Sequence, residues 1–393
     1  MTDQDKSSLR PDSIPSVPGF PAILILYISV GQGHRRAALA LGEALRADNP
    51  LLRIVILDLL KLWPSGIGRL AAGLYRGLVR AVPGVWGYLY DRPEVKEKLN
   101  SPLAGLHRRL RGRLERMIED LDPAVVVCTQ AFPCALAAQC QRRSARKFAL
   151  VAVPTDFHVH AYWIYPEVDL YLLPAQESVE TMRGRGVDPK KLRTTGIPVG
   201  AGFNQSPDPA RMKLKYGLNP DLPAVLLMGG GEGTVSLERL VLALDGGESK
   251  FQLAALAGSN RKQYGRLLAL RGEIRRTLTV FGFTDLVEEL MTAVEVIVTK
   301  PGGLSLAEAL VKRRPLVLID PLPGQEELNA RFLSGHQAAI PARDNPGAVR
   351  AVAALLRDEK LRGRMLAAMD RIRKPDAARE AARIIVSSFL NVG

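Results

Sequence analysis

The sequence is poor in cysteine, and the few cysteines it has form no recognisable framework. Cys128, Cys134 and Cys140 are odd in number and lie six residues apart, which suits neither a zinc site nor a set of disulfides. This pattern argues against a disulfide-stabilised secreted domain and predicts a reducing, cytoplasmic setting. Cys128 stands in an apolar run, where a cysteine behaves as a small buried hydrophobic residue.

Long apolar runs are also missing, and acidic residues are outnumbered. No run approaches the length of a bilayer span, so we expect any membrane contact to be made at the surface. With 54 Lys and Arg against 40 Asp and Glu, the net charge of +14 favours a polyanionic partner. Residues 61–117 mix many of these basic residues with Trp63, Trp86 and aliphatic side chains. The mixture predicts docking on an anionic membrane and no nucleic-acid binding, and solvated amphipathic helices are the alternative.

Short β-rich runs alternate with helical patterns along the chain, which is typical of parallel sheets covered on both faces. The run AILILYISV (residues 22–30) opens the first half, and VLLMGGGEG (residues 225–233) opens the second. Gly and Pro interrupt the pattern at residues 195–203. We therefore expect an α/β fold with two Rossmann-like, doubly wound domains that face each other across a cleft.

Composition and pattern also predict the domain boundaries. Residues 1–20 are polar and rich in Pro and Ser, and we expect them to form a disordered tail. Residues 21–196 form the N-terminal domain and residues 197–375 the C-terminal domain. Residues 376–393 include a helical stretch that no strand follows, and we expect this helix to pack across both domains.

Glycine-rich loops follow the strands of the second half, at the edge where open α/β sheets bind ligands. In TKPGGLSLAEAL (residues 299–310), the N–H groups of Gly303, Leu304 and Ser305 would point at an anion. Glu308 lies one turn further along the helix and suits the hydroxyls of a ribose. A plain glycine turn with Ser305 as the helix cap is the structural alternative.

Two neighbouring loops add polar groups at the same edge. Gly229 and Gly230 offer backbone amides to a diphosphate. Gln325 and Glu326 stand side by side after a strand and can bracket vicinal sugar hydroxyls, or simply begin a solvated helix. The three loops together predict a site for a nucleotide-diphosphate sugar. The sequence has no useful metal motif, so we expect no metal and no other cofactor.

The first half carries histidines and an aspartate at its own ligand-binding edge. Gly33 and His34 occupy the first strand-to-helix turn, and Asp156 and His160 follow a later strand in PTDFHVHAYW. A helix N-terminus disfavours the imidazolium form and keeps a histidine neutral, as a general base must be. His34 is therefore a candidate base or phosphate contact, and Asp156 is the other candidate base. A surface or capping histidine is the structural alternative.

Six motifs stand in the order typical of one family: SVGQGHRRAALAL, PTDFHVHAYW, TTGIPV, VLLMGGGEG, TKPGGLSLAEAL and PGQEELNARF. From about residue 23 onwards the chain resembles the monogalactosyldiacylglycerol synthase and processive diacylglycerol β-glucosyltransferase branch of glycosyltransferase family 28. That family is similar in fold to the lipid I N-acetylglucosaminyltransferase, which has the GT-B arrangement of two Rossmann-like domains.

The resemblance implies inverting transfer of glucose or galactose from a UDP-sugar to the hydroxyl of a membrane lipid, diacylglycerol above all. The C-terminal domain would bind the donor. Phe283 would meet uracil, Gly302, Gly303 and Leu304 the diphosphate, Glu308 the ribose, and Gln325 and Glu326 the hexose. The acceptor and membrane side would include His34, Asp156 and the basic segment, and we add Gly33, Trp63, Trp86, His160 and Trp163.

Departures from the family pattern favour a bacterial enzyme that works on the cytoplasmic face of the cell membrane. Gln32 stands where the galactosyl enzymes usually carry glycine, and KPGG resembles the bacterial glucosyl enzymes. Two other functions remain open: a UDP-sugar epimerase of the same fold, and a non-catalytic UDP-sugar sensor at the membrane. An epimerase would act on a soluble sugar nucleotide without lipid, and a sensor would bind UDP-hexose without turnover.

Overall fold

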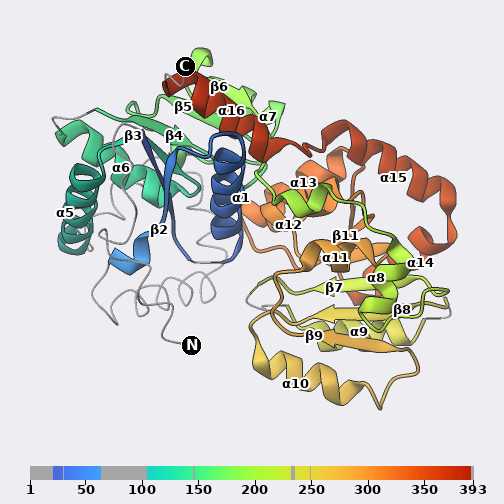
Figure 1. The fold of residues 1–393 in the computed structure, drawn as a ribbon. Coiled ribbons are helices and arrows are strands. Elements are labelled where there is room, and N and C mark those ends of the chain that lie inside the picture. Colours follow the sequence, from blue (N-terminus) through green and yellow to red (C-terminus); the bar gives the residue numbers. More distant parts are fainter. Residues whose placement is uncertain are drawn as a thin grey trace.

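The computed structural model describes residues 21–29, 31–62, 104–144, 147–231, 235–247 and 249–390. Figure 1 shows two lobes, each built on a sheet that helices cover. Within these ranges both sheets have six strands, and all paired strands run parallel. The expected α/β architecture of two Rossmann-like halves is therefore confirmed.

The first sheet has the strand order β2-β1-β3-β4-β5-β6. All six residues of β1 are buried, because a strand covered on both faces needs an apolar side chain at every position. The strand order reverses between β1 and β3, so the loops after these strands separate and form a ligand-binding edge. The strands are β1 (Ala22–Tyr27), β2 (Arg53–Asp58), β3 (Pro123–Cys128), β4 (Ala149–Ala152), β5 (Leu170–Leu173) and β6 (Leu192–Thr194).

Four α-helices connect the described strands of this half: α1 (Gly33–Asp48), α5 (Ala104–Leu121), α6 (Ala131–Arg143) and α7 (Gln176–Gly184). Helix α1 buries Ala37, Ala38, Leu41 and Leu45, which recur at helical spacing. Helix α5 buries Leu110, Leu114 and Ile118 in the same way. Short 3₁₀ turns complete the connections at Leu59–Leu62, Ala161–Trp163 and Pro189–Lys191.

The second sheet has the strand order β12-β11-β10-β7-β8-β9. Here the order reverses between β10 and β7, so the loops after these two strands border the corresponding edge. The strands are β7 (Ala224–Met228), β8 (Gln252–Leu256), β9 (Leu278–Phe281), β10 (Val296–Thr299), β11 (Leu316–Leu318) and β12 (Ile340–Pro341). The helices are α8 (Pro209–Lys215), α9 (Leu237–Asp245), α10 (Arg261–Leu270), α11 (Val287–Thr292), α12 (Gly303–Val311), α13 (Gln325–Gly335), α14 (Asn345–Arg357) and α15 (Glu359–Ile372), with a 3₁₀ turn at Ala201–Asn204.

The last helix, α16 (Ala377–Phe389), returns to the first half of the chain. Figure 1 shows it in dark red over the lobe that contains α1, and the two helices are in contact. Its buried residues Ala381, Ala382 and Ile385 belong to the same hydrophobic cluster as Ile23 and Leu41. The first half therefore completes its core with residues from the far end of the chain. The boundaries at residues 196 and 375 stay predictions.

Candidate active site

His34 lies in the first turn of α1, directly after β1, and two threonines hold its ring. Its Nδ1 is 3.0 Å from the carbonyl oxygen of Thr129 and 2.8 Å from the hydroxyl of Thr155. The Thr129 hydroxyl in turn donates to the carbonyl oxygen of His34 over 3.0 Å. Thr129 follows β3 and Thr155 follows β4, so neighbouring strands bring the three residues together.

The environment of His34 favours the neutral imidazole. Burial lowers its pKa, while the carboxylate of Asp156 and the hydrogen bond to Thr129 act in the opposite direction. The first turn of α1 carries no acidic residue and no side-chain cap, so the positive end of the helix dipole adds to the effect of burial. A neutral ring near physiological pH can accept a proton.

Asp156 extends from the first half to the first turn of α12 in the second half. Its Oδ1 accepts a hydrogen bond from Asn329 Nδ2 over 2.9 Å, and the N–H of Gly303 also donates to its carboxylate. Burial raises the pKa of Asp156, and the charge of His34 and these hydrogen bonds partly offset the rise. The carboxylate therefore sits at a helix N-terminus, where an anion is stabilised.

Asn329, on α13, is fully buried and joins three segments. Its Oδ1 accepts from the N–H of Phe157 over 2.8 Å, and its Nδ2 donates to Asp156 and, over 3.1 Å, to the carbonyl oxygen of Pro301. The ring of Phe157 stacks on Phe332 of the same helix, with centroids 4.6 Å apart. One side chain thus fixes the loop that carries Asp156 against the glycine loop of the other half.

Arg36 and Glu308 form a second link between the halves. Arg36 Nη2 lies 3.1 Å from Glu308 Oε1, and Glu308 is only 1% exposed. The second carboxylate oxygen, Oε2, is buried with no hydrogen-bond partner. Burial raises the pKa of Glu308 to about 7, although Arg36 lowers it in part. The predicted ribose contact therefore points at an arginine of the opposite half in this arrangement.

The glycine loops of the two halves also touch. A Cβ at Gly303 would lie 2.1 Å from the carbonyl oxygen of Thr155, and one at Gly231 would lie 2.6 Å from Gln32 Cγ. Gly33 faces Leu304 at 3.5 Å by the same measure. The two ligand-binding edges are thus in direct contact at these loops, where we had expected a cleft between the domains.

The other predicted donor residues surround this contact. Gly230 has a φ of +81° and leaves room for the Lys300 side chain, whose Nζ lies 2.6 Å from Glu326 Oε1. Glu326 is buried and also accepts from the N–H of Leu322, so its carboxylate is already bonded to the protein on both oxygens. Gly229 and Leu304 are buried, Gly302, Ser305 and Gln325 are half-buried, and Phe283 is 53% exposed. Their roles toward a nucleotide sugar stay predictions.

The predicted acceptor residues fall into three groups. Gly33 lies at the contact just described, and His160 is half-buried beside Tyr162 and Trp163. Trp163 is 4% exposed and belongs to the core cluster of the first half, and its role on the acceptor and membrane side stays a prediction. Trp63 and Trp86 lie outside the described residues.

Four residues at the site did not emerge from the sequence: Arg36, Thr129, Thr155 and Asn329. Two of them had a usable signal, because Thr155 directly precedes Asp156 in one motif and Asn329 lies within PGQEELNARF. Arg36 stands two residues after His34, but its partner Glu308 lies 272 positions further along the chain. Spacing in the sequence therefore does not predict this contact.

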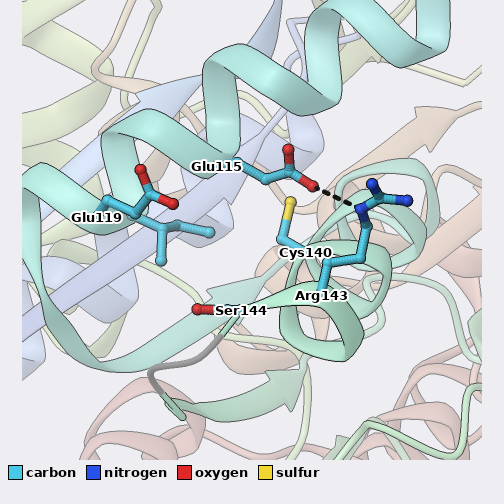
Figure 2. A pocket seen from close by; sticks show the side chains of 6 residues that line it. Glu115, Glu119, Cys140, Arg143 and Ser144 are labelled. Carbon is cyan, nitrogen blue, oxygen red and sulfur yellow. Dashed lines mark ion pairs between the residues drawn. The ribbon is translucent and has the colours of Figure 1, made fainter.

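A separate cavity lies between α5 and α6 (Figure 2), and its volume is about 140 Å³. Glu115, Glu119, Cys140 and Arg143 line it, and burial raises the pKa of the Cys140 thiol to about 12. Ligand pockets usually measure about 300–1,000 Å³, so this cavity is too small for a nucleotide sugar. The described residues contain no group of three or more His, Cys, Asp or Glu able to hold a metal ion. None of the described helices is both long enough and apolar enough to span a membrane.

Models of two protein families match the chain. The monogalactosyldiacylglycerol (MGDG) synthase model matches residues 34–199, and the model of the glycosyltransferase family 28 C-terminal domain matches residues 224–385. Among curated relatives, the processive diacylglycerol beta-glucosyltransferase of Bacillus mycoides (strain KBAB4) is 28% identical over 360 residues, which are 91% of this chain and 91% of the relative.

Solved structures share the fold at low sequence identity. MurG of Acinetobacter baumannii has a TM-score of 0.65 and 14% identity, over 93% of this chain and 99% of that one. The UDP-GlcNAc 2-epimerase of Neisseria meningitidis, solved bound to UDP-GlcNAc, has a TM-score of 0.61 and 12% identity, over 93% and 100%. The two Rossmann-like halves are thus those of a GT-B fold, which transferases and epimerases share.

Proposed function

Because the chain belongs to the MGDG synthase and family 28 group of glycosyltransferases, we propose that it transfers glucose or galactose from a UDP-sugar to the hydroxyl of diacylglycerol, with inversion. The name of the Bacillus mycoides relative supports the acceptor and a glucosyl donor, and the name of the matched N-terminal family supports a galactosyl lipid. The observation that carries the proposal is that Asp156, whose charge acts on His34, meets the first turn of α12 at Gly303.

The proposed donor site lies in the second half. The diphosphate would bind at the N–H groups of Gly303 and Leu304, with the ammonium of Lys300 beside the neighbouring Gly230. The first turn of α12 supports this role because Gly302 stands at its N-cap without a side-chain cap, and the Gly303 N–H already binds an anion, the carboxylate of Asp156. The reaction then uses no metal, since these amides and the lysine meet the charge of the leaving UDP.

The transfer step assigns one role to each half. The acceptor oxygen forms a bond to the anomeric carbon from the side opposite the phosphate. The bond from that carbon to the β-phosphate oxygen breaks, and its electron pair leaves with UDP. His34 takes the proton of the acceptor hydroxyl, because its ring is neutral and lies at the edge that faces α12. Asp156 would then stabilise the imidazolium that forms.

We propose that the protein works as a peripheral protein on the cytoplasmic face of a bacterial membrane. Exposed arginines on α5 support this: Arg108, Arg109, Arg113 and Arg116 lie on its solvent face, opposite the buried Leu110 and Leu114. Basic side chains at this density attract anionic lipids. The remainder of the predicted docking segment, residues 63–103, lies outside the described residues.

Labelled UDP-glucose and UDP-galactose, each offered with diacylglycerol liposomes, test the proposal directly. We expect one of them to yield a labelled lipid, and we expect His34→Ala to lower the rate by about 10²- to 10⁴-fold, as for loss of a general base. His336→Gln is the control, because His336 also lies between the halves but bonds to Glu177 and Phe332. Circular dichroism checks that both variants fold.

The outcomes separate the other functions. Labelled lipid from neither donor would refute the proposal. Interconversion of soluble UDP-sugars without lipid would then indicate an epimerase, and UDP-hexose binding without any turnover would indicate a sensor. A His34→Ala variant with full activity would remove this residue from the chemistry while leaving the transfer itself in place.

A further inference from the structure

The two contacts of His34 Nδ1 decide which ring nitrogen is able to act as a base. Nδ1 faces the carbonyl oxygen of Thr129 at 3.0 Å and the hydroxyl of Thr155 at 2.8 Å. A carbonyl oxygen only accepts hydrogen bonds, so a lone pair on Nδ1 would repel it. If Nδ1 carries the proton, both oxygens accept it, and the lone pair of the neutral ring is on Nε2.

Both threonines are buried, which protects their contacts with His34 from water. Thr129 is 0% exposed and Thr155 is 4% exposed, so water does not compete for their oxygens. The Thr129 hydroxyl also donates to the His34 carbonyl, which fixes the first turn of α1 against the end of β3. Thr129 therefore fixes the backbone of His34, and the Thr155 hydroxyl limits the rotation of the imidazole ring.

We propose that Thr155 is a positioning residue: its hydroxyl, together with the Thr129 carbonyl, keeps the proton of neutral His34 on Nδ1 and leaves Nε2 to receive the acceptor proton. The catalytic role of Thr155 rests on the proposed transferase function, whereas its hydrogen bond to His34 does not. It identifies the reacting atom of the base and adds one side chain to the residues that the reaction needs. The Thr155 hydroxyl contacts His34 and would act through it.

Nitrogen-15 NMR of the ring tests the geometry without any sugar transfer. The chain has five histidines, so His34 can be assigned by comparison with His34→Gln. We expect a protonated Nδ1 and an unprotonated Nε2 at neutral pH in the unaltered protein. Thr155→Val should raise the population of the opposite tautomer, which only the Thr129 carbonyl then opposes, and lower the titration midpoint of His34, because an acceptor that favours the imidazolium is lost. Thr155→Ser keeps the hydroxyl and should restore both signals.

Kinetics test the use of that geometry. We expect Thr155→Val to lower kcat by about 10-fold or more, with little change in KM for the UDP-sugar, because a loosely held base is rarely aligned. The acid limb of kcat/KM should move to lower pH together with the NMR midpoint, and Thr155→Ser should recover most of the rate. Thr292→Val is the matched control, since its equally buried hydroxyl donates to the Glu288 carbonyl within the same helix.

Three results would overturn the inference: a protonated Nε2 in the unaltered protein, an unchanged pH profile and rate in Thr155→Val, or a Thr155→Ser variant as impaired as Thr155→Val. Loss of thermal stability alone, with the ring signals and the acid limb unchanged, would mean that Thr155 is purely structural. If the NMR result holds and no lipid product forms with either donor, the geometry stands and the proposed transferase function fails.

Discussion

At the scale of single residues, Glu308 links stability to pH. The folded protein buries this carboxyl, which raises its pKa from an ordinary 4.5 to about 7. Between these values the unfolded chain has already lost the proton that the folded protein still holds. Stability therefore falls as the pH rises through this interval and stays lower above it, by up to about 3 kcal/mol.

Glu308→Gln removes this cost. We expect the variant to unfold at a higher temperature than the unaltered protein at pH 8, where Glu308 is ionised and its Oε2 has no partner. At pH 5 the two proteins should differ little, because the carboxyl is then protonated when folded. Differential scanning calorimetry at the two pH values measures the effect. A difference in melting temperature that is the same at both values would contradict it.

Glu289→Gln is a control with the opposite sign. Hydrogen bonds from Lys215 and Tyr216 lower the pKa of Glu289, so its ionised form stabilises the fold. That contribution is present above the ordinary pKa of a glutamate and is lost as the pH falls through the lowered value. This variant should therefore be less stable than the unaltered protein at pH 8, and the deficit should shrink in acid.

At the scale of elements, the contact between the halves depends on the start of α12. A Cβ at Gly303 would stand 2.1 Å from the Thr155 carbonyl oxygen and 2.9 Å from Asp156 Oδ1, whereas a Cβ at Gly302 meets nothing within 4 Å. Neither glycine has a positive φ, so alanine suits the backbone at both positions. Comparing alanine at Gly303 with alanine at Gly302 therefore separates the effect of the contact between the halves from any effect on the helix itself.

We expect Gly303→Ala to separate the two halves and Gly302→Ala to leave them together. Separation should increase the radius of gyration measured by small-angle X-ray scattering and abolish a chemical cross-link between Gln32→Cys and Gly231→Cys. Gly302→Ala should keep both the radius and the cross-link. An unchanged radius and cross-link in Gly303→Ala would mean that the loop adapts without opening.

Most elements could be predicted from the sequence, because strands buried on both faces appear as continuous apolar runs. Residues 124–128 and 224–228 are examples, and both became strands with every or nearly every residue buried. The return of α16 could not be predicted in this detail, because an amphipathic helix does not specify which of two apolar surfaces it covers. Its 13 residues fit a helix between any two α/β layers equally well.

The site could be predicted loop by loop but not as a constellation. His34, Asp156 and Gly303 each follow a strand, and the rule for carboxyl edges brings them to the correct edges. Which side chains then meet depends on the relative orientation of two separately folded sheets. Arg36 with Glu308 and Asn329 with Asp156 are such pairs, and no periodicity within either half encodes them.

At the scale of the whole molecule, the contact between the halves uses groups that the proposed donor site needs. Asp156 occupies the N–H of Gly303, and Arg36 occupies Glu308, the proposed ribose ligand. His336 and Glu177 add a further pair at 2.9 Å between α13 and α7. If the proposed donor site is correct, a nucleotide must displace the first two of these contacts.

Arg36→Leu should therefore bind UDP several-fold more tightly than the unaltered protein in isothermal titration calorimetry at pH 8, where Glu308 is ionised. Arg46→Leu is the control, because Arg46 stands on the same helix but donates to the Ile54 carbonyl within the first half. Weaker binding in Arg36→Leu alone would show that Arg36 contacts the nucleotide instead of competing with it.

The position of α16 also has a consequence for synthesis of the protein. The first half is translated first, yet its core includes Ala381, Ala382 and Ile385, which are translated after the second half. The described strands of the second half and helices α8–α15 lie in one stretch of the chain before that point. We therefore expect the second half to fold before the first, the reverse of the usual order along a nascent chain. Until α16 has been translated, the α1 face that it covers stays available to chaperones.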